Sequence, residues 1–322
     1  MTPPTLEDIR QARSALEGVI SRTPLMRHPL LAAETGLDIY VKHENHNPTG
    51  AFKIRGGLNL IAALSDAECE RGVITASTGN HGQSIAFAAK RFAIPCTVAV
   101  PVGNNPDKNA AMRAFGAEVV EHGKDFDEAR EWVEQEAVAR GLRYVHSANE
   151  PLLIAGVGTY ALEIFEDLPD ADVIFVPIGG GSGASGCGIV RTALGSTTRI
   201  IGVQAEEADA FTRSWRGPDR VVGDRAATFA EGVATRYTFD LPFEILKHEL
   251  YDVVTLTEAE LEEGVRLALR ATHNLAEGAG GAALMAAVKA GELLRGQKVV
   301  CVMSGGNLNT SVLGRILGGS SG

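Results

Sequence analysis

Residues 173–186 read VIFVPIGGGSGASG, and this stretch indicates the class of fold. Its first six residues are apolar and largely β-branched, which is typical of a strand buried on both faces of a sheet. The glycines and serines that follow predict a tight turn into a helix. A buried strand that leads through such a turn into a helix is characteristic of α/β proteins.

The rest of the chain repeats this alternation of strands and helices. Segments with helical spacing lie between the strand candidates, and before one of them Thr257 fits an N-cap with Glu260 as its capping-box partner. The alternation predicts an α/β fold with a parallel sheet that helices cover on both faces. The strand candidates are residues 39–43, 72–77, 96–101, 118–122, 143–147, 173–178, 199–205, 251–257 and 298–304.

Composition excludes several classes of function. The 322 residues are enough for two domains, and the net charge of −10 disfavours nucleic acid or an anionic membrane as a partner. The four cysteines are widely spaced and the first residues lack an apolar leader segment, so we expect a cytoplasmic protein without disulfides. The uncharged stretch 173–190 contains six glycines and a proline, so it fails as a membrane helix.

The glycine-rich turn at 179–183 suggests an anion site. Backbone N–H groups of successive small residues can converge on a phosphate, and the positive end of the following helix adds to the attraction. A tight turn without any ligand is one alternative. Another is dinucleotide binding, because Gly181, Gly183 and Gly186 form a GxGxxG pattern with Glu206 20 residues further on. That alternative predicts a nicotinamide-dependent oxidoreductase.

Two more polar segments follow strand candidates. The hydroxyls, amide and free N–H groups of STGNHG at 77–82 suit a carboxylate or a phenolate oxygen, although simple helix capping by Ser77 or Thr78 also explains them. SGGN at 304–307 has the same two interpretations. Since ligands bind at the carboxyl ends of parallel strands, we expect these segments and residues 179–183 to share one small-molecule site.

Lys53 lies in the stretch NPTGAFKIRGG, residues 47–57, between an aromatic and a β-branched residue. Loss of hydration in such surroundings lowers the pKa of an amine, which then spends time uncharged and nucleophilic. A neutral lysine and a phosphate cradle together predict a pyridoxal 5′-phosphate enzyme, in which the lysine forms the Schiff base. The nicotinamide alternative leaves Lys53 unexplained.

Other common catalytic arrangements are missing from the sequence. His43 and His46 do not have the HExxH spacing of a metalloprotease, and no strand candidate leads into a G-x-S-x-G nucleophile elbow. We therefore expect neither a metal site nor serine hydrolase chemistry.

With these motifs the chain resembles the fold-type II pyridoxal-phosphate enzymes, most closely the serine/threonine dehydratase (threonine ammonia-lyase) and serine racemase branch. PTGAFKIRGG, STGNHGQ, PIGGGSG and SGGN occur in the order and spacing of that family. The resemblance covers essentially the whole chain, because further motifs are RTPL (22–25), AGVGTYALEI (155–164), EGV (231–233) and AEGAGGAAL (276–284).

The resemblance implies two open parallel-sheet domains of the tryptophan synthase β-like kind. Residues 1–71 and 150–322 would form the large cofactor-binding domain. Residues 72–149 would form a small mobile domain inserted into it, which would move over the site and exclude water. A homodimer is also expected from the family.

The resemblance also implies roles for individual residues. Lys53, beside Phe52, would carry the cofactor and act as the base at Cα, and Asn80 would hydrogen-bond the cofactor's ring oxygen. Ser304 would face the pyridine nitrogen. The phosphate would lie on Gly179, Gly180, Gly181 and Ser182, with Gly183 shaping the turn. The substrate carboxylate would lie on Ser77, Thr78, Gly79, Asn80 and His81, and Gly232 and Glu277 would line the pocket.

The implied reaction is the β-elimination of a β-hydroxy amino acid such as L-threonine or L-serine to a 2-oxo acid and ammonia. A neutral serine beside the pyridine nitrogen makes the ring a weaker electron sink, which favours prompt loss of a β-leaving group over transamination. A β-replacement synthase, an amino-acid racemase and a non-catalytic binder of a phosphorylated ligand are the alternatives. The short chain resembles the catabolic dehydratases, which have no appended regulatory domain.

Three departures from the family pattern bear on specificity. Thr78 stands where the racemases carry serine, and as a catalytic residue its hydroxyl would protonate the face of Cα opposite Lys53. Its extra methyl group would crowd that face, which disfavours racemisation. Gln204 and Ala210 replace the carboxylates of the racemases' divalent-cation site, so no metal site is expected there. HSANEP at 146–151 differs from the usual pattern near the substrate side chain, which leaves β-aryl-serine and 3-hydroxyaspartate as alternative substrates. For 3-hydroxyaspartate, Arg130 would pair with the additional acidic group.

Overall fold

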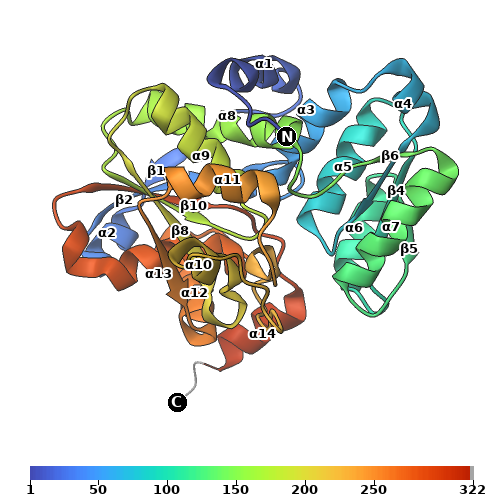
Figure 1. Ribbon diagram of the computed structural model, residues 1–322. Helices are drawn as coiled ribbons and strands as arrows, with labels where there is room; N and C mark the ends of the chain where they lie inside the picture. Colours follow the sequence, from blue (N-terminus) through green and yellow to red (C-terminus); the bar gives the residue numbers. More distant parts are fainter. Residues whose placement is uncertain (320–322) are drawn as a thin grey trace.

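The computed structural model describes residues 1–319 and contains two sheets (Figure 1). The larger sheet has six strands, of which five are parallel and only the short edge strand β1 is antiparallel to its neighbour. Its apolar central strands are buried on both faces, as the sequence predicts. In spatial order the strands are β1 (Leu25–Arg27), β2 (Asp38–His43), β10 (Lys298–Met303), β7 (Val173–Pro177), β8 (Arg199–Ala205) and β9 (Asp252–Leu256).

The smaller sheet has four strands, all parallel, and lies to the right in Figure 1. All four strands lie within residues 73–144, inside the segment that we expect to form the inserted small domain. The independent movement of that segment stays a prediction. In spatial order its strands are β5 (Glu118–Glu121), β4 (Cys96–Val100), β3 (Val73–Ala76) and β6 (Arg143–Tyr144).

Helices cover both faces of the large sheet and bury two separate apolar cores. One core lies between the sheet and a first helical layer that contributes residues such as Ile9, Cys187 and Leu246. This layer contains α1 (Leu6–Leu16), α8 (Pro151–Asp167), α9 (Ser182–Ala193), α10 (Ala210–Arg216) and α11 (Asp240–Glu249). The opposite layer contains α2 (Pro29–Thr35), α12 (Glu258–Thr272) and α13 (Gly278–Ala290). Two-sided coverage of this kind is what a parallel sheet requires.

The small sheet is covered on both faces as well. One core joins it to α3 (Lys53–Ala62), α5 (Asn80–Arg91) and α6 (Pro106–Ala114), and the other to α7 (Phe126–Arg140). Because α3 packs against both α5 and α8, it connects the layers of the two sheets. The remaining elements are α4 (Asp66–Arg71), α14 (Thr310–Gly318), and the 3₁₀ turns η1 (Glu44–His46), η2 (Glu206–Ala208), η3 (Glu231–Val233) and η4 (Gly291–Leu294).

All nine predicted strands occur, with small differences at their ends. The strand predicted at 143–147 stops at Tyr144, and β1 was not predicted because three residues are too few to show alternation. The predicted capping box is confirmed: Thr257 N donates to Glu260 Oε2 at 2.8 Å, and Glu260 N donates to Thr257 Oγ1 at 3.2 Å. Within residues 1–319, no helix combines the length and apolar character needed to cross a membrane.

Candidate active site

A cavity of about 510 Å³ lies where the two sheets face each other. It is lined by the segments that follow β3, β7 and β10, together with Lys53 at the start of α3. The three strand exits therefore share one site, as expected from the parallel arrangement. The sequence-predicted residues that line it are Phe52, Lys53, Ser77, Thr78, Gly79, Asn80, His81, Gly179, Gly180, Gly181, Ser182, Gly183, Gly232, Glu277 and Ser304.

Lys53 is the first residue of α3 and reaches across the cavity to the glycine loop. Its Nζ donates to Ser182 Oγ at 3.2 Å and lies 5.2 Å from the centre of the Phe52 ring. Burial lowers the pKa of Lys53 to about 8 from the usual 10.5. About a tenth of this amine is therefore neutral and nucleophilic at pH 7, far more than for an ordinary lysine, as the apolar flanking residues predict.

The glycine loop at 179–181 forms a cradle that side chains would fill. A Cβ on Gly179 would lie 2.1 Å from Gly232 O, and one on Gly180 would lie 3.1 Å from Ala148 Cβ. Gly181 has φ +87° and precedes Ser182, where α9 begins. The free N–H groups of this turn and the positive end of α9 suit a phosphate, so the residues present fit a phosphorylated cofactor.

The dinucleotide interpretation of the same loop has less support. A Cβ on Gly186 would lie 2.7 Å from Gly158 Cα, so this glycine allows α9 to pack closely on α8. Glu206 is exposed at the start of η2 and is not among the residues that line the cavity. The third glycine and the acidic residue of that pattern thus have no place at the site.

The Ser77 side chain caps the start of α5, as the interpretation of residues 77–82 as a simple helix cap predicts. Its Oγ accepts from Gly79 N at 3.1 Å and from Gly82 N at 2.8 Å, at the start of α5. The hydroxyl proton of Ser77 is not used in these two bonds, so the side chain can still donate to a carboxylate. Thr78 lines the cavity, and its carbonyl oxygen accepts from Asn104 Nδ2 at 3.3 Å.

Asn80 is held by one residue at the start of α13 and one that follows β10. Its Nδ2 donates to Glu277 Oε1 at 2.7 Å, and its Oδ1 accepts from Asn307 Nδ2 at 2.8 Å. Asn307, from the SGGN segment, also donates to Thr49 O at 2.8 Å. Burial raises the pKa of Glu277 against the lowering effect of Lys108 and of the Asn80 hydrogen bond. One amide hydrogen of Asn80 remains for a ligand oxygen.

The hydrogen bonds of His81 determine which of its ring nitrogens carries the proton. The Thr75 hydroxyl donates to Val145 O at 2.8 Å, so it must accept from His81 Nε2, which is 2.9 Å away. Burial and the positive charge of Lys53 lower the pKa of His81 to about 3, which keeps the ring neutral. The second ring nitrogen is then an acceptor and cannot donate to a carboxylate. A contact of His81 with the substrate carboxylate would have to come from its backbone N–H.

The structure corrects the place given to Arg130. This residue lies on α7 outside the cavity lining, and its Nη1 is bound to Glu134 Oε1 at 2.6 Å, one helical turn further on. The arginine that lines the cavity is Arg236, whose Nη2 is 2.7 Å from Asp127 Oδ2. Tyr237 Oη donates to Asp127 Oδ1 at 2.8 Å.

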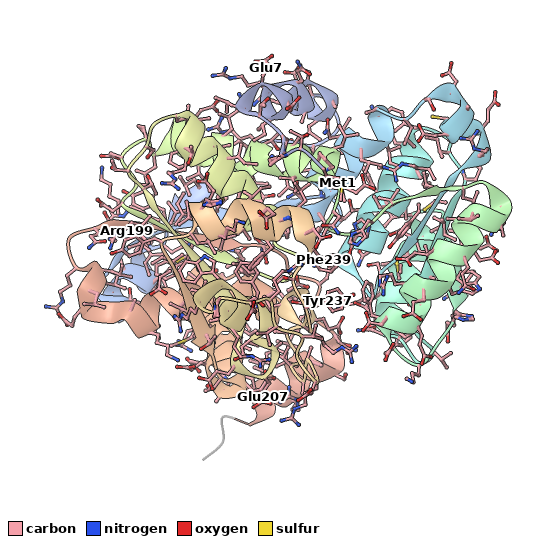
Figure 2. All side chains as sticks on the ribbon, in the orientation of Figure 1. Met1, Glu7, Arg199, Glu207, Tyr237 and Phe239 are labelled. Atoms are coloured by element: carbon pink, nitrogen blue, oxygen red, sulfur yellow. The ribbon has the colours of Figure 1, made fainter. Side chains whose placement is uncertain are left out.

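Sequence reasoning missed this group because residues 217–239 carry no strong periodicity and follow no strand candidate. In Figure 2, Tyr237 and Phe239 lie on the side of the large-sheet part that faces the small sheet. Lys108 also lines the cavity and was missed. Its Nζ is 2.7 Å from Glu231 Oε2, in the EGV motif.

Gln204, which the resemblance aligns with the racemases' cation site, makes hydrogen bonds within the protein. Gln204 Oε1 accepts from the backbone N and the Oγ1 of Thr212, both at 2.9 Å. In the part of the chain that the structure describes, no three His, Cys, Asp or Glu side chains are grouped so that they could hold a metal ion.

Comparisons with known proteins find similar chains over nearly the whole length of this one. A family described as pyridoxal-phosphate dependent enzyme matches residues 16–305. The L-threonine ammonia-lyase of Thermotoga maritima is 40% identical over 315 residues, which cover 97% of this chain and 78% of that protein. The processed form of threonine deaminase isoform 2 from Solanum lycopersicum has a TM-score of 0.91 at 28% identity, over 99% of this chain and 96% of that one. Maize serine racemase has a TM-score of 0.92 at 26% identity, over 99% and 98% of the two chains.

Proposed function

The chain belongs to the family of pyridoxal-phosphate-dependent enzymes, and we propose that it converts L-threonine and L-serine to the corresponding 2-oxo acid and ammonia. The observation that carries this proposal is a lysine of lowered pKa, about 8, that faces a glycine cradle in a chain 40% identical to an L-threonine ammonia-lyase. In the overall reaction, the amino acid first loses the Cα proton and the β-hydroxyl as water. A water molecule then hydrolyses the product to the 2-oxo acid and ammonia.

The cofactor would be held by residues from all three strand exits. Lys53 Nζ would bond to its aldehyde carbon, and the N–H groups of residues 179–182 would bind its phosphate. The free amide hydrogen of Asn80 would reach its ring oxygen, and Ser304 would face its ring nitrogen. When bound, the cofactor supplies an electron sink for the electrons left at Cα after proton removal.

The protein's own groups would manage the protons and the substrate. The lowered pKa of Lys53 places this amine near the range in which it can take a proton from Cα and return it later. The Ser77 hydroxyl and the N–H groups at the start of α5 would hold the substrate carboxylate. Burial and the positive charge of Lys53 lower the pKa of His81, so its ring stays neutral and adds no second positive charge beside the amine.

The test is the release of 2-oxo acid from the holoenzyme with L-threonine, L-serine, β-phenylserine and 3-hydroxyaspartate. We expect turnover with L-threonine or L-serine that disappears when the cofactor is removed. Formation of D-serine without 2-oxo acid would favour the racemase alternative. The similarity to maize serine racemase supports this alternative. Release of a thioether from added thiol would favour a β-replacement synthase.

Closure of the small domain, a cytoplasmic location and dimerisation, which are expected from the family, are part of the same proposal. Residues 72–149 would close over the bound substrate, and the contacts of Asp127 and Lys108 with the large-sheet part would tighten in that state. The enzyme would be a cytoplasmic homodimer. Sedimentation equilibrium measures the dimer, and small-angle X-ray scattering with and without L-threonine measures the closure.

A further inference from the structure

The positive charges around the cavity are nearly all neutralised by carboxylates. Among the described residues that line it, the lysines and arginines are Lys53, Lys108 and Arg236. Lys108 is paired with Glu231 at 2.7 Å, and Arg236 is paired with Asp127 at 2.7 Å. Lys53 is the residue that would bond to the cofactor. No cation of the described cavity wall is therefore left to hold a second carboxylate on the substrate.

The groups that surround the Asp127 side chain form a binding position for one carboxylate, which the protein or a ligand could supply. Its Oδ2 takes a charged hydrogen bond from Arg236, and its Oδ1 accepts from Tyr237 Oη at 2.8 Å. Arg130 Nε lies 3.9 Å from the same Oδ1 and, within residues 1–319, is buried without a hydrogen-bond partner. Two guanidinium groups and a phenol thus face one carboxylate, which here is supplied by α7.

We propose that Asp127 is a specificity-determining residue, which makes the enzyme reject amino acids with an acidic side chain by occupying the position between Arg236 and Tyr237. This inference rests on the proposed function. An acidic substrate entering the cavity would bring a second carboxylate to a guanidinium that is already paired, and like charges sharing one cation repel. A neutral hydroxyalkyl side chain such as that of threonine meets no such repulsion.

Asp127→Asn removes the charge and keeps a side chain of the same shape, so Arg236 becomes an unneutralised cation at the cavity wall. We use the binding of L-aspartate and of L-alanine to the holoenzyme, followed by the change in cofactor absorbance, because neither amino acid has a β-hydroxyl to lose. The dissociation constant for L-aspartate, divided by that for L-alanine, should fall by about 10-fold or more in the variant. The specificity constant for turnover of 3-hydroxyaspartate, relative to that for L-threonine, should rise.

Two further variants separate the proposal from a general charge effect. Asp125→Asn makes the same change of charge in the same cavity lining, and asparagine preserves the N-cap that Asp125 provides for α7. The double variant Asp127→Asn with Arg236→Gln removes the freed guanidinium. We expect the ratio of dissociation constants to stay unchanged in the first and to return to the wild-type value in the second.

An unchanged ratio in Asp127→Asn would overturn the inference, and so would an equal shift in Asp125→Asn. Thermal unfolding of each holoenzyme shows whether the variants are folded. The wild-type assay with L-threonine and L-serine tests the proposed function separately, because the binding ratio for L-aspartate and L-alanine requires no turnover.

Discussion

Lys53 and Arg55 lie two residues apart on α3, yet their surroundings give them opposite properties. Lys53 faces the cavity, where its nearest polar partner is the neutral hydroxyl of Ser182, and burial lowers its pKa to about 8. Burial alone would also lower the pKa of Arg55, but Glu44 and Glu163 raise it above its usual value. One cation is thus prepared to lose its proton, whereas the other is fixed in its charged form.

The Arg55 side is a closed network of charges beneath the active site. Arg55 Nε is 2.8 Å from Glu44 Oε2, and its Nη1 is 2.7 Å from Glu163 Oε1. Lys42 Nζ adds a contact of 2.5 Å to Glu163, and Thr23 Oγ1 donates to Glu44 Oε1 at 2.5 Å. These residues come from β2, η1, α3 and α8 and from the RTPL motif, so the network fixes the elements that carry Lys53.

Burial alone therefore does not determine the role of these two cations, because the groups around each of them differ. Arg55, with two carboxylates, keeps its charge and holds the structure together, whereas Lys53, which has no carboxylate partner within residues 1–319, is prepared to act as a reagent. Four experiments test this difference between Lys53 and Arg55.

The largest effect is expected from Lys53→Ala. This change removes the group that would bond to the cofactor and take the Cα proton, so kcat should fall by roughly 10³-fold or more. The free energy of unfolding of the apoprotein should not fall, because the change removes a charged form that burial disfavours. Lys247→Ala, at an exposed position on α11, is the control for turnover and stability. A Lys53→Ala enzyme that kept its turnover would end the proposed role of this lysine.

Arg55→Met should have the next largest effect, on stability. It leaves Glu44 and Glu163 buried with only Lys42 as a cation, which costs about 3–5 kcal/mol in unfolding free energy measured by urea denaturation. Arg270→Met is the matched control, since Arg270 also lies between two carboxylates, Glu34 and Glu263, but its side chain is 49% exposed. There the loss should be about 1 kcal/mol or less. Equal losses in the two variants would contradict the comparison.

The pKa of Lys53 predicts the pH dependence of cofactor capture by the apoprotein. The neutral amine is the reactive form, so the rate constant for pyridoxal 5′-phosphate uptake should rise about tenfold per pH unit below the pKa. It should level off near pH 8, because the pKa is lowered to about 8. Stopped-flow absorbance measures the rate. A rate that continues to climb towards pH 10 would mean that Lys53 keeps an ordinary pKa.

The smallest effect is expected from Ser182→Ala. Its hydroxyl accepts from Lys53 Nζ at 3.2 Å and so favours the charged amine slightly. Without it, the midpoint of cofactor capture should move to lower pH by less than about one unit. Ser185→Ala, on the same helix, removes a buried hydroxyl whose Oγ has no partner among the described residues, and it should leave the midpoint in place. A shift to higher pH in Ser182→Ala would reverse the assigned effect of this contact.

Much of the architecture could be predicted from sequence because its signals are local. Apolar, β-branched segments predicted all strands except β1, and Thr257 with Glu260 marked the start of α12. The convergence of residues 77–82, 179–183 and 304–307 follows from a general rule of parallel sheets. The environment of Lys53 could be inferred because its sequence neighbours are also neighbours in space.

The contacts that were missed join residues distant in sequence. Arg236 meets Asp127 across 109 positions, and Arg55 meets Glu163 across 108. Arg130 has the same charge as Arg236 and lies on a predicted helix, but helical periodicity did not reveal that its Nη1 pairs with Glu134 and that the residue lies outside the cavity lining. Residues 217–239 lack regular spacing, so no pattern placed their side chains.

The role of Lys53 as the lysine that bonds to the cofactor is tested most directly by borohydride reduction of the purified holoenzyme, followed by peptide mass mapping. We predict that the visible absorbance of the cofactor disappears on reduction and that a phosphopyridoxyl group is found on the peptide containing Lys53. A modification on another lysine, or no incorporation after addition of pyridoxal 5′-phosphate, would contradict the claim that Lys53, the half-buried lysine of α3 without a carboxylate partner among the described residues, is the reactive group.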